Sequence, residues 1–281
     1  MLTPALFILA LASAEPSPLL RRYEAGEHFR YRITQTETRN GQTSRLEAIT
    51  EHDVVPLGAG FAEQVRWVSI HSGGIDRSAE SAAIPSYTLS LEEGQSLESP
   101  RPAGAVDLVG LTTDLQTFYV AVSPALGIAN LIMPGDSFTR PELIIGDFAD
   151  GAAILSGRDC TMATLTLRSL DPESGSAVVE TRFLPPTSSC LSAAAAGGEG
   201  APDNFQMVRK VGDQFLDLHG RESFVIVTTL EGRRGRIARA EMVNTLELSG
   251  RSCADAALTR CAAIPDVKRE RRVSLALETS D

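Results

Sequence analysis

The sequence predicts a mainly β protein: a curved, largely antiparallel sheet or half-open barrel of about nine strands, with one short helix packed on it. Three observations favour this fold class. Apolar and polar residues alternate along most of the chain, and turns rich in glycine, proline, asparagine and aspartate separate the alternating runs. Only one segment has a clear helical period. Because short turns join most successive strands, their pairing is expected to be antiparallel.

The first strands follow one another closely. Residues 29–34 alternate between apolar and polar side chains, and Asn40-Gly41 supplies a favoured two-residue hairpin turn. A return strand is expected over 43–55. Residues 61–71 carry apolar side chains on both faces, which is typical of a central strand partly covered on both sides.

The helical segment comes next. Four apolar residues share one face at spacing i, i+3, i+4 and i+7: Leu115, Phe118, Tyr119 and Val122. Thr113 and Gln116 fit a capping box at its start, and a second helical piece is expected over 125–133. The helix must bury its apolar stripe, so we expect 113–122 to pack on the concave face of the sheet.

The other alternating runs complete the sheet. They predict strands at 87–91, 161–170, 177–184, 222–230, 236–248 and 268–278. The one basic cluster, 268–272, is divided by alternation between two strand faces, and we interpret it as a solvated cluster or the guard of a sheet edge rather than as a site for a polyanion. We expect one β-rich domain over 15–281, with 99–104 as the best candidate for a seam and 188–203 as a mobile loop.

Composition excludes several function classes. The chain has 281 residues and a net charge of −10, which disfavours a nucleic-acid partner. Neither a P-loop nor G-x-G-x-x-G occurs, so no nucleotide cofactor is expected. Histidines and cysteines are not spaced as metal ligands, so no metal is expected either. Arginine supplies 24 of the 26 basic residues, because only Lys210 and Lys268 are lysines, so a lone arginine is weak evidence of a site.

The first segment indicates export. Residues 1–14 form an apolar run that ends in Ala12-Ser13-Ala14, which fits a signal peptide with cleavage before Glu15. No later stretch is long and apolar enough to span a bilayer as a helix, so no transmembrane segment is expected in the mature chain. The expected location is secreted or periplasmic.

An oxidising compartment would favour disulfides. Four cysteines permit three pairings, of which we favour Cys253–Cys261 with Cys160–Cys190, because the first pair is local and lies at a predicted connection between strands.

A resemblance follows from three segments: the opening strand with Tyr31-Arg32-Ile33-Thr34-Gln35, the helix Asp114-Leu115-Gln116-Thr117-Phe118-Tyr119, and the loop between Cys253 and Cys261. In these features and their order the chain resembles secreted bacterial β-proteins that have no assigned function. Strands that wrap a short helix are also similar, at the level of fold alone, to the lipoprotein-localisation carriers, which hold acyl chains in a half-open barrel.

These observations leave three functions open. The favoured one is an exported, non-catalytic β-protein that binds a lipid or other apolar ligand, or a partner, between sheet and helix. Its candidate ligand contacts are the four residues of the helical stripe with Trp67 opposite, and plain core packing is the alternative for all five. The second is a structural or assembly component of the envelope, with an envelope protein as partner. The third is a secreted hydrolase centred on one of the histidines, His28, His52, His71 or His219.

Overall fold

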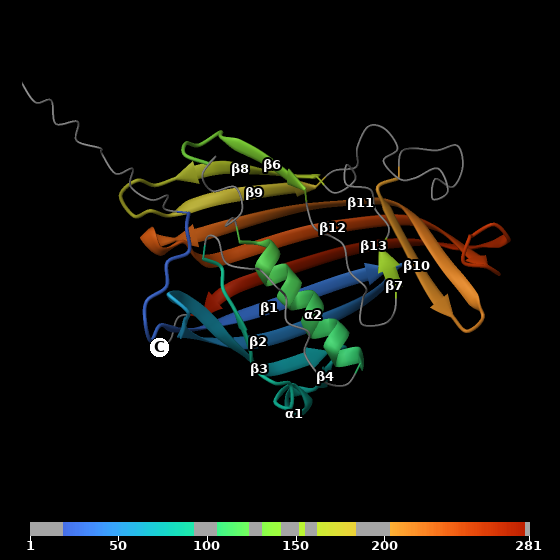
Figure 1. The fold of residues 1–281 in the computed structure, drawn as a ribbon, viewed down its shortest axis with the longest axis horizontal. Coiled ribbons are helices and arrows are strands. Elements are labelled where there is room, and N and C mark those ends of the chain that lie inside the picture. The colour runs from blue at the N-terminus through green and yellow to red at the C-terminus, as the bar shows by residue number, and fades with distance from the viewer. Residues whose placement is uncertain are drawn as a thin grey trace, which may run out of the picture.

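A computed structural model describes residues 19–92, 106–123, 131–141, 152–154, 162–183 and 203–278. Within these residues thirteen strands form one sheet, whose longest path runs β4-β3-β2-β1-β13-β12-β11-β9-β8-β6 (Figure 1). Every pair of neighbouring strands in it is antiparallel. The sheet is open, with β4 and β6 at the two ends of this path. The predicted mainly β, antiparallel fold is confirmed.

The strands differ greatly in length. The first five are β1 (His28–Arg39), β2 (Gln42–Leu57), β3 (Gly60–Ser72), β4 (Ile75–Asp76) and β5 (Tyr87–Leu89). The next five are β6 (Ser137–Pro141), β7 (Ala152–Ile154), β8 (Met162–Leu170), β9 (Ala177–Phe183) and β10 (Phe205–Val211). The last three, β11 (Gln214–Glu231), β12 (Arg236–Cys253) and β13 (Cys261–Glu278), are the longest. The described helical segments are α1 (Ser78–Ser81), α2 (Val106–Ala121) and the 3-10 turn η3 (Gly232–Arg234).

Alternation along the strands gives the sheet two unlike faces. The face on which α2 packs, here called the inner face, carries Tyr31, Ile33, Ala48, Ala240 and Leu275, each at most 2% exposed. These residues are cross-strand neighbours, since Ile33 on β1 lies opposite Ala48 on β2 and Leu275 on β13. Removing their apolar surface from water contributes roughly 0.8 kcal/mol per buried methylene group. The inner face therefore supplies the main core.

The outer face carries ion pairs between neighbouring strands. Arg30 on β1 and Arg66 on β3 both pair with Glu51 on β2. Arg32 pairs both with Glu47 on β2 and with Glu278 at the end of β13. Arginine is thus the usual cation of this face, as the composition indicated, and each of these three arginines has a carboxylate partner.

Helix α2 crosses the inner face obliquely (Figure 1). Near its end, the hydroxyl of Thr228 on β11 donates a hydrogen bond to the carbonyl of Val122 at 3.0 Å. The predicted start at Thr113 is wrong, because α2 begins at Val106 and the Thr113 carbonyl accepts a bond from Thr117 within the helix. The helix is apolar on more than one side, so the amphipathic stripe does not mark where it begins.

The strand count also needs correction, from about nine to thirteen. The four additional strands are β4, β6, β7 and β10. Two of them span only two or three residues, too few to show a period of two. Residues 131–133, the described end of the second helical piece expected over 125–133, are not helical.

The basic cluster at 268–272 does not lie at an edge. It belongs to β13, which pairs with β1 on one side and β12 on the other. The edge interpretation is therefore wrong, because the strand is 18 residues long and is paired on both sides. Alternation does divide the cluster, and Arg269 and Arg271 share the inner-face register of Val273 and Leu275.

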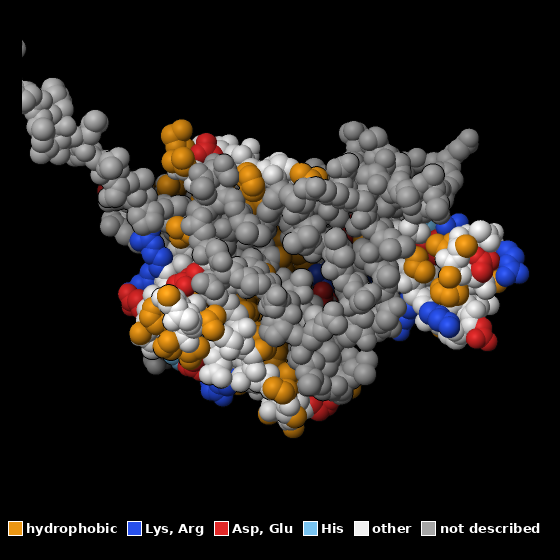
Figure 2. Space-filling model, in the orientation of Figure 1, with side chains coloured by type: hydrophobic (Ala, Val, Ile, Leu, Met, Phe, Trp, Pro, Cys, Tyr) orange, Lys and Arg blue, Asp and Glu red, His pale blue; other side chains and the backbone are white. Residues whose placement is uncertain are grey.

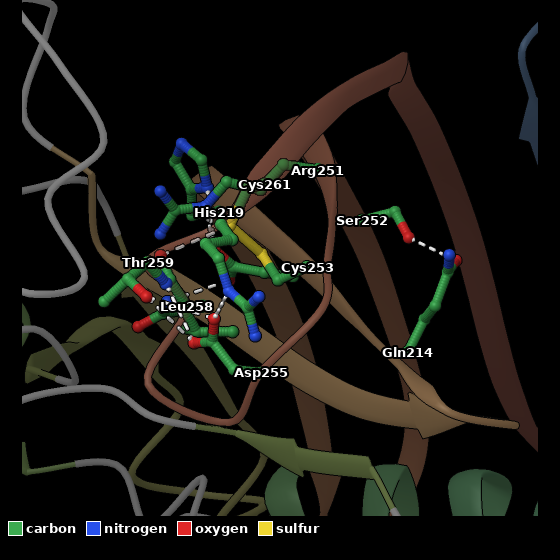
Figure 3. Close-up of a disulfide and its surroundings, with 12 residues drawn as sticks. Gln214, His219, Arg251, Ser252, Cys253, Asp255, Leu258, Thr259 and Cys261 are labelled. Carbon is green, nitrogen blue, oxygen red and sulfur yellow. Dashed lines mark hydrogen bonds and ion pairs between the residues drawn. A yellow bond between two sulfur atoms is a disulfide. The ribbon is translucent and has the colours of Figure 1, made fainter.

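One predicted disulfide is present. Cys253 and Cys261 lie directly opposite each other at the end of the β12–β13 pair and are joined (Figure 3). Asp255 in the connecting loop accepts hydrogen bonds from the backbone of Thr259 and from Nε of Arg260, both at 3.1 Å. The predictions for Cys160 and Cys190, for the seam at 99–104 and for nearly all of the loop 188–203 lie outside the described residues.

Candidate functional site

The most enclosed charged group on the inner face is the carboxylate of Glu63 on β3, which is 0% exposed. Its Oε1 accepts a hydrogen bond from the hydroxyl of Tyr23 at 2.9 Å. Its Oε2 lies 2.7 Å from the hydroxyl of Tyr119 on α2 and 2.7 Å from Nδ1 of His52 on β2. We call these four residues, with Arg21, the Glu63 cluster. It ties the segment before β1, two neighbouring strands and α2 to a single carboxylate.

Arg21 supplies positive charge to this cluster. Its Nε lies 3.8 Å from Oε1 of Glu63, and its Nη2 lies 3.0 Å from Oε2 of Glu27. Burial by itself raises the pKa of Glu63, but the hydrogen bond and charge of His52, the charge of Arg21 and the hydrogen bond from Tyr119 together lower that pKa further than burial raises it. The net pKa lies below the ordinary value, so the buried carboxylate is ionised at neutral pH.

All four tyrosines of the chain have pKa values raised above the ordinary 10. They are Tyr23, Tyr31, Tyr87 and Tyr119. Burial is the largest cause for each pKa, and the negative charge of Glu63 is the second. The hydroxyls of Tyr23 and Tyr119 therefore stay protonated and act as hydrogen-bond donors to the carboxylate.

His52 also links Glu63 to a hydroxyl. Its Nε2 lies 3.0 Å from Oγ1 of Thr50 on the same strand. When the proton is on Nδ1, the order hydroxyl, imidazole, carboxylate is that of a nucleophilic relay. Thr50 and His52 are each 2% exposed, and the rings of Phe29 and Tyr119 lie 5.0 Å from the imidazole. The relay is therefore enclosed in this structure.

The structure does not bring two histidines of the first three strands together. His28 is exposed and bonds to Asp53 at 2.7 Å, on the opposite face of the sheet from His52, whose cross-strand neighbour is Phe29. Nε2 of His71 lies 3.6 Å from Oδ1 of Asp76 on the edge strand β4. His219 on β11 lies 3.7 Å from Asp217. Each histidine has its own carboxylate, and no shared histidine site forms among them.

The five predicted ligand contacts fall in one apolar cluster, between 1% and 4% exposed: Trp67, Leu115, Phe118, Tyr119 and Val122. The stripe of α2 and Trp67 thus belong to one buried core cluster, and their contact with a ligand stays a prediction. Two buried polar groups there have no hydrogen-bond partner among the described residues. They are the indole Nε1 of Trp67 and both carboxamide atoms of Gln116, whose side chain is 1% exposed.

A polar belt crosses the inner face beside this cluster. Along β12, Ala240 and Met242 belong to the main core, Asn244 follows, and Leu246 and Leu248 belong to a second apolar cluster. The belt consists of Asn244, Glu222 on β11, Arg269 and Arg271 on β13, and Arg39 on β1. It therefore separates two apolar regions of one surface, and Figure 2 shows charged side chains near the middle of this face with apolar ones beside them.

Contacts within the belt leave donors unused. The amide of Asn244 donates to Glu222 at 2.8 Å, and Arg269 donates to the Asn244 oxygen at 3.3 Å. Arg271 pairs with Asp114 of α2. Burial raises the pKa of Glu222, against the hydrogen bond from Asn244 and the charges of both arginines. The Nε atoms of Arg269 and Arg271 are buried and have no hydrogen-bond partner within the ranges that the structure describes.

Sequence reasoning did not identify Glu63 or the belt, although a signal was present. Strand alternation places His52 in register with Ala48 and Val54, and Glu63 in register with Val65 and Trp67. A titratable residue within an apolar register is a candidate for a buried site. Which of these residues meet depends on strand pairing, which alternation alone does not give.

No group of three or more His, Cys, Asp or Glu side chains in the described ranges is arranged to hold a metal ion. No helix among the described residues is long and apolar enough to cross a membrane. No protein-family model matches this chain, and no curated protein sequence matches it.

Proposed function

We propose that this chain is an exported, non-catalytic β-protein that binds a lipid-like, amphiphilic ligand between the inner face of its sheet and α2. The observation that carries the proposal is the set of unpartnered polar atoms on Trp67 and Gln116. A buried polar group without a hydrogen bond costs roughly 1–3 kcal/mol, so such groups require an explanation. The oxygen atoms of an amphiphile would satisfy them while its chain contacts the apolar residues around them.

Export is part of the proposal. It is supported by the signal-peptide pattern of residues 1–14 and by the Cys253–Cys261 disulfide, since disulfides persist mainly in oxidising compartments. Expression of the full chain in a bacterium with an outer membrane, followed by fractionation and N-terminal sequencing, tests it. We expect a periplasmic or secreted protein that begins at Glu15. Cytoplasmic retention of the uncut chain would contradict export.

Trp67 is the only tryptophan, so its fluorescence reports on the proposed ligand site alone. The test titrates the purified, delipidated protein with a brominated stearic acid, whose bromine quenches a tryptophan that it contacts. We expect saturable quenching of Trp67, together with lipid detected by mass spectrometry in solvent extracts of the protein before delipidation. Unquenched Trp67 and lipid-free extracts would refute ligand binding.

A matched pair of substitutions on α2 sharpens the test. Gln116→Leu removes the two unpartnered atoms, so the ligand-free protein should be as stable as the wild type or more stable. The same variant should bind the ligand more weakly, because the carboxamide no longer hydrogen-bonds to it. Thr117→Val on the exposed side of the same helix should leave affinity unchanged. Equal affinity of all three proteins would exclude Gln116 as a ligand contact.

The hydrolase alternative is favoured by one observation, the Thr50–His52–Glu63 relay. A threonine hydroxyl polarised by such a pair is a potential nucleophile for ester substrates. Hydrolysis of chromogenic esters of increasing chain length tests this function. Turnover by the wild type that Thr50→Val abolishes would favour it, whereas no turnover, or turnover unaffected by Thr50→Val, would contradict it.

A further inference from the structure

Two arginines face each other across the inner face. Arg39 on β1 and Arg269 on β13 are directly opposite in the antiparallel register, and Arg271 is the next residue of β13 on the same face. Side chains directly opposite in such a pair have Cβ atoms about 4.5–5.5 Å apart, and like charges there destabilise the sheet. The three side chains therefore concentrate positive charge in one place.

This charge is only partly neutralised by the described part of the chain, through the Arg271–Asp114 pair and the nearby carboxylate of Glu222. Neither Arg39 nor Arg269 makes an ion pair there, whereas the outer-face arginines Arg30, Arg32 and Arg66 all do. The nearby carboxylates have other partners, since Asp114 pairs with Arg271 and Glu222 bonds to Asn244. Glu37 lies opposite Arg271 but makes no ion pair with it. In a chain of net charge −10, two arginines without a carboxylate partner are notable.

The guanidinium groups also carry hydrogen-bond donors that the described residues do not use. The Nε atoms of Arg269 and Arg271 are buried and unpartnered. A guanidinium presents its donors in a planar fork that matches the two oxygens of a carboxylate or phosphate. The apolar clusters on either side of the belt would accept the chain of a molecule whose charged end lies at these arginines.

We infer that Arg39, Arg269 and Arg271 form an anion site on the inner face, and that it takes the carboxylate or phosphate end of the amphiphile. This inference rests on the proposed function and adds that the ligand is anionic: its charged end lies at these arginines, and the oxygen atoms that meet Trp67 and Gln116 lie elsewhere along the molecule. Arg39 is exposed, but Arg269 and Arg271 are half-buried, so their attraction for the anion is screened by salt less than that of fully exposed charges is.

The experiment compares palmitate with hexadecanol, which has the same chain and no charge, by Trp67 fluorescence and calorimetry. The variants are Arg269→Gln and Arg39→Gln. The matched control is Arg272→Gln, because Arg272 is on the same strand but points to the outer face, where its partner is Glu270. Inorganic phosphate is titrated in parallel, to separate the head group of an amphiphile from a free anion.

We expect the wild type to bind palmitate at least about 10-fold more tightly than hexadecanol. Arg269→Gln should remove most of that preference, Arg39→Gln should reduce it, and Arg272→Gln should keep it. Equal binding of palmitate and hexadecanol in all proteins would overturn the anion site and leave the proposed function standing.

If neither amphiphile binds, the proposed function fails. Phosphate binding then shows whether the arginines bind a free anion. Binding that Arg269→Gln removes would assign them to a free anion, and no phosphate binding would remove the site altogether. Either result overturns the inference that they hold the end of an amphiphile.

Discussion

Glu63→Gln tests the physical account of the buried cluster most directly. The substitution keeps the shape of the side chain and removes its charge. In the wild type, Oε2 interacts with Tyr119 and His52 and Oε1 with Tyr23, while Arg21 lies 3.8 Å away. A carboxamide replaces one oxygen with an NH₂ donor, so at least one existing donor would then face another donor.

The magnitude follows from these contacts. A hydrogen bond to a charged group contributes about 1.5–3 kcal/mol, and removing one partner of a buried charge pair costs about 3–5 kcal/mol. Arg21 keeps its pairing with Glu27 at 3.0 Å in the variant, which limits the penalty of an uncompensated buried charge. We therefore expect Glu63→Gln to lower the free energy of unfolding at pH 7 by about 3 kcal/mol.

Urea unfolding followed by circular dichroism between pH 7 and pH 3 measures this difference. The pKa of Glu63 is lower in the folded state than the ordinary 4.5, so its ionised form stabilises the fold above pH 4.5. That contribution is lost as the pH falls through the folded-state pKa. The difference between wild type and variant should shrink over the same range.

Glu47→Gln is the control, since Glu47 is 46% exposed and pairs with Arg32 on the outer face. An exposed pair of this kind contributes about 0–1 kcal/mol. If Glu63→Gln costs no more than this control, or if its cost does not depend on pH, the reasoning about a buried ionised carboxylate is refuted.

Three other predictions concern the fold. Absorbance at 295 nm should show no tyrosinate near pH 10 while the protein is folded, because the pKa values of all four tyrosines are raised. The free energy of unfolding should fall above pH 10, where the tyrosines of the unfolded chain ionise. Tyrosinate in the folded protein near pH 10 would contradict the raised pKa values. Gly235→Ala should lower the free energy of unfolding in urea by about 2 kcal/mol or more, because a Cβ there would clash with the carbonyl oxygen of Leu20. Gly41→Ala, where φ is also positive but nothing lies within 4 Å of the added Cβ, should cost only about 1 kcal/mol. Equal costs would exclude the close approach to Leu20 as the cause. Replacing both Cys253 and Cys261 by serine should lower the free energy of unfolding by about 2.5 kcal/mol, the loop-closure contribution of so short a loop, and an unchanged urea midpoint would contradict that role.

The buried site shows how far strand periodicity reaches. Alternation correctly predicted that Tyr31, Ile33 and Leu275 point to one face, because successive side chains of a strand point in opposite directions. The same rule put His52, Glu63 and Arg269 on that face, where a polar side chain is the exception. It could not show that Glu63 meets Tyr119, because 56 residues separate the two and the path of α2 over the sheet brings them together.

The sequence by itself determined the class of fold, most of the long strands and the existence of the helix, and it favoured the Cys253–Cys261 pairing among three, because each depends on residues close together in the chain. Only the tertiary structure decided that β13 lies in the middle of the sheet and that Arg39 lies opposite Arg269. The strand order places β1 beside β13, which is far from it in sequence. The contacts that stabilise this order are therefore contacts between distant segments of the chain. For that reason the ionised cluster at Glu63, and the juxtaposition of Arg39 and Arg269 without an ion pair in the described part of the chain, became visible only in three dimensions.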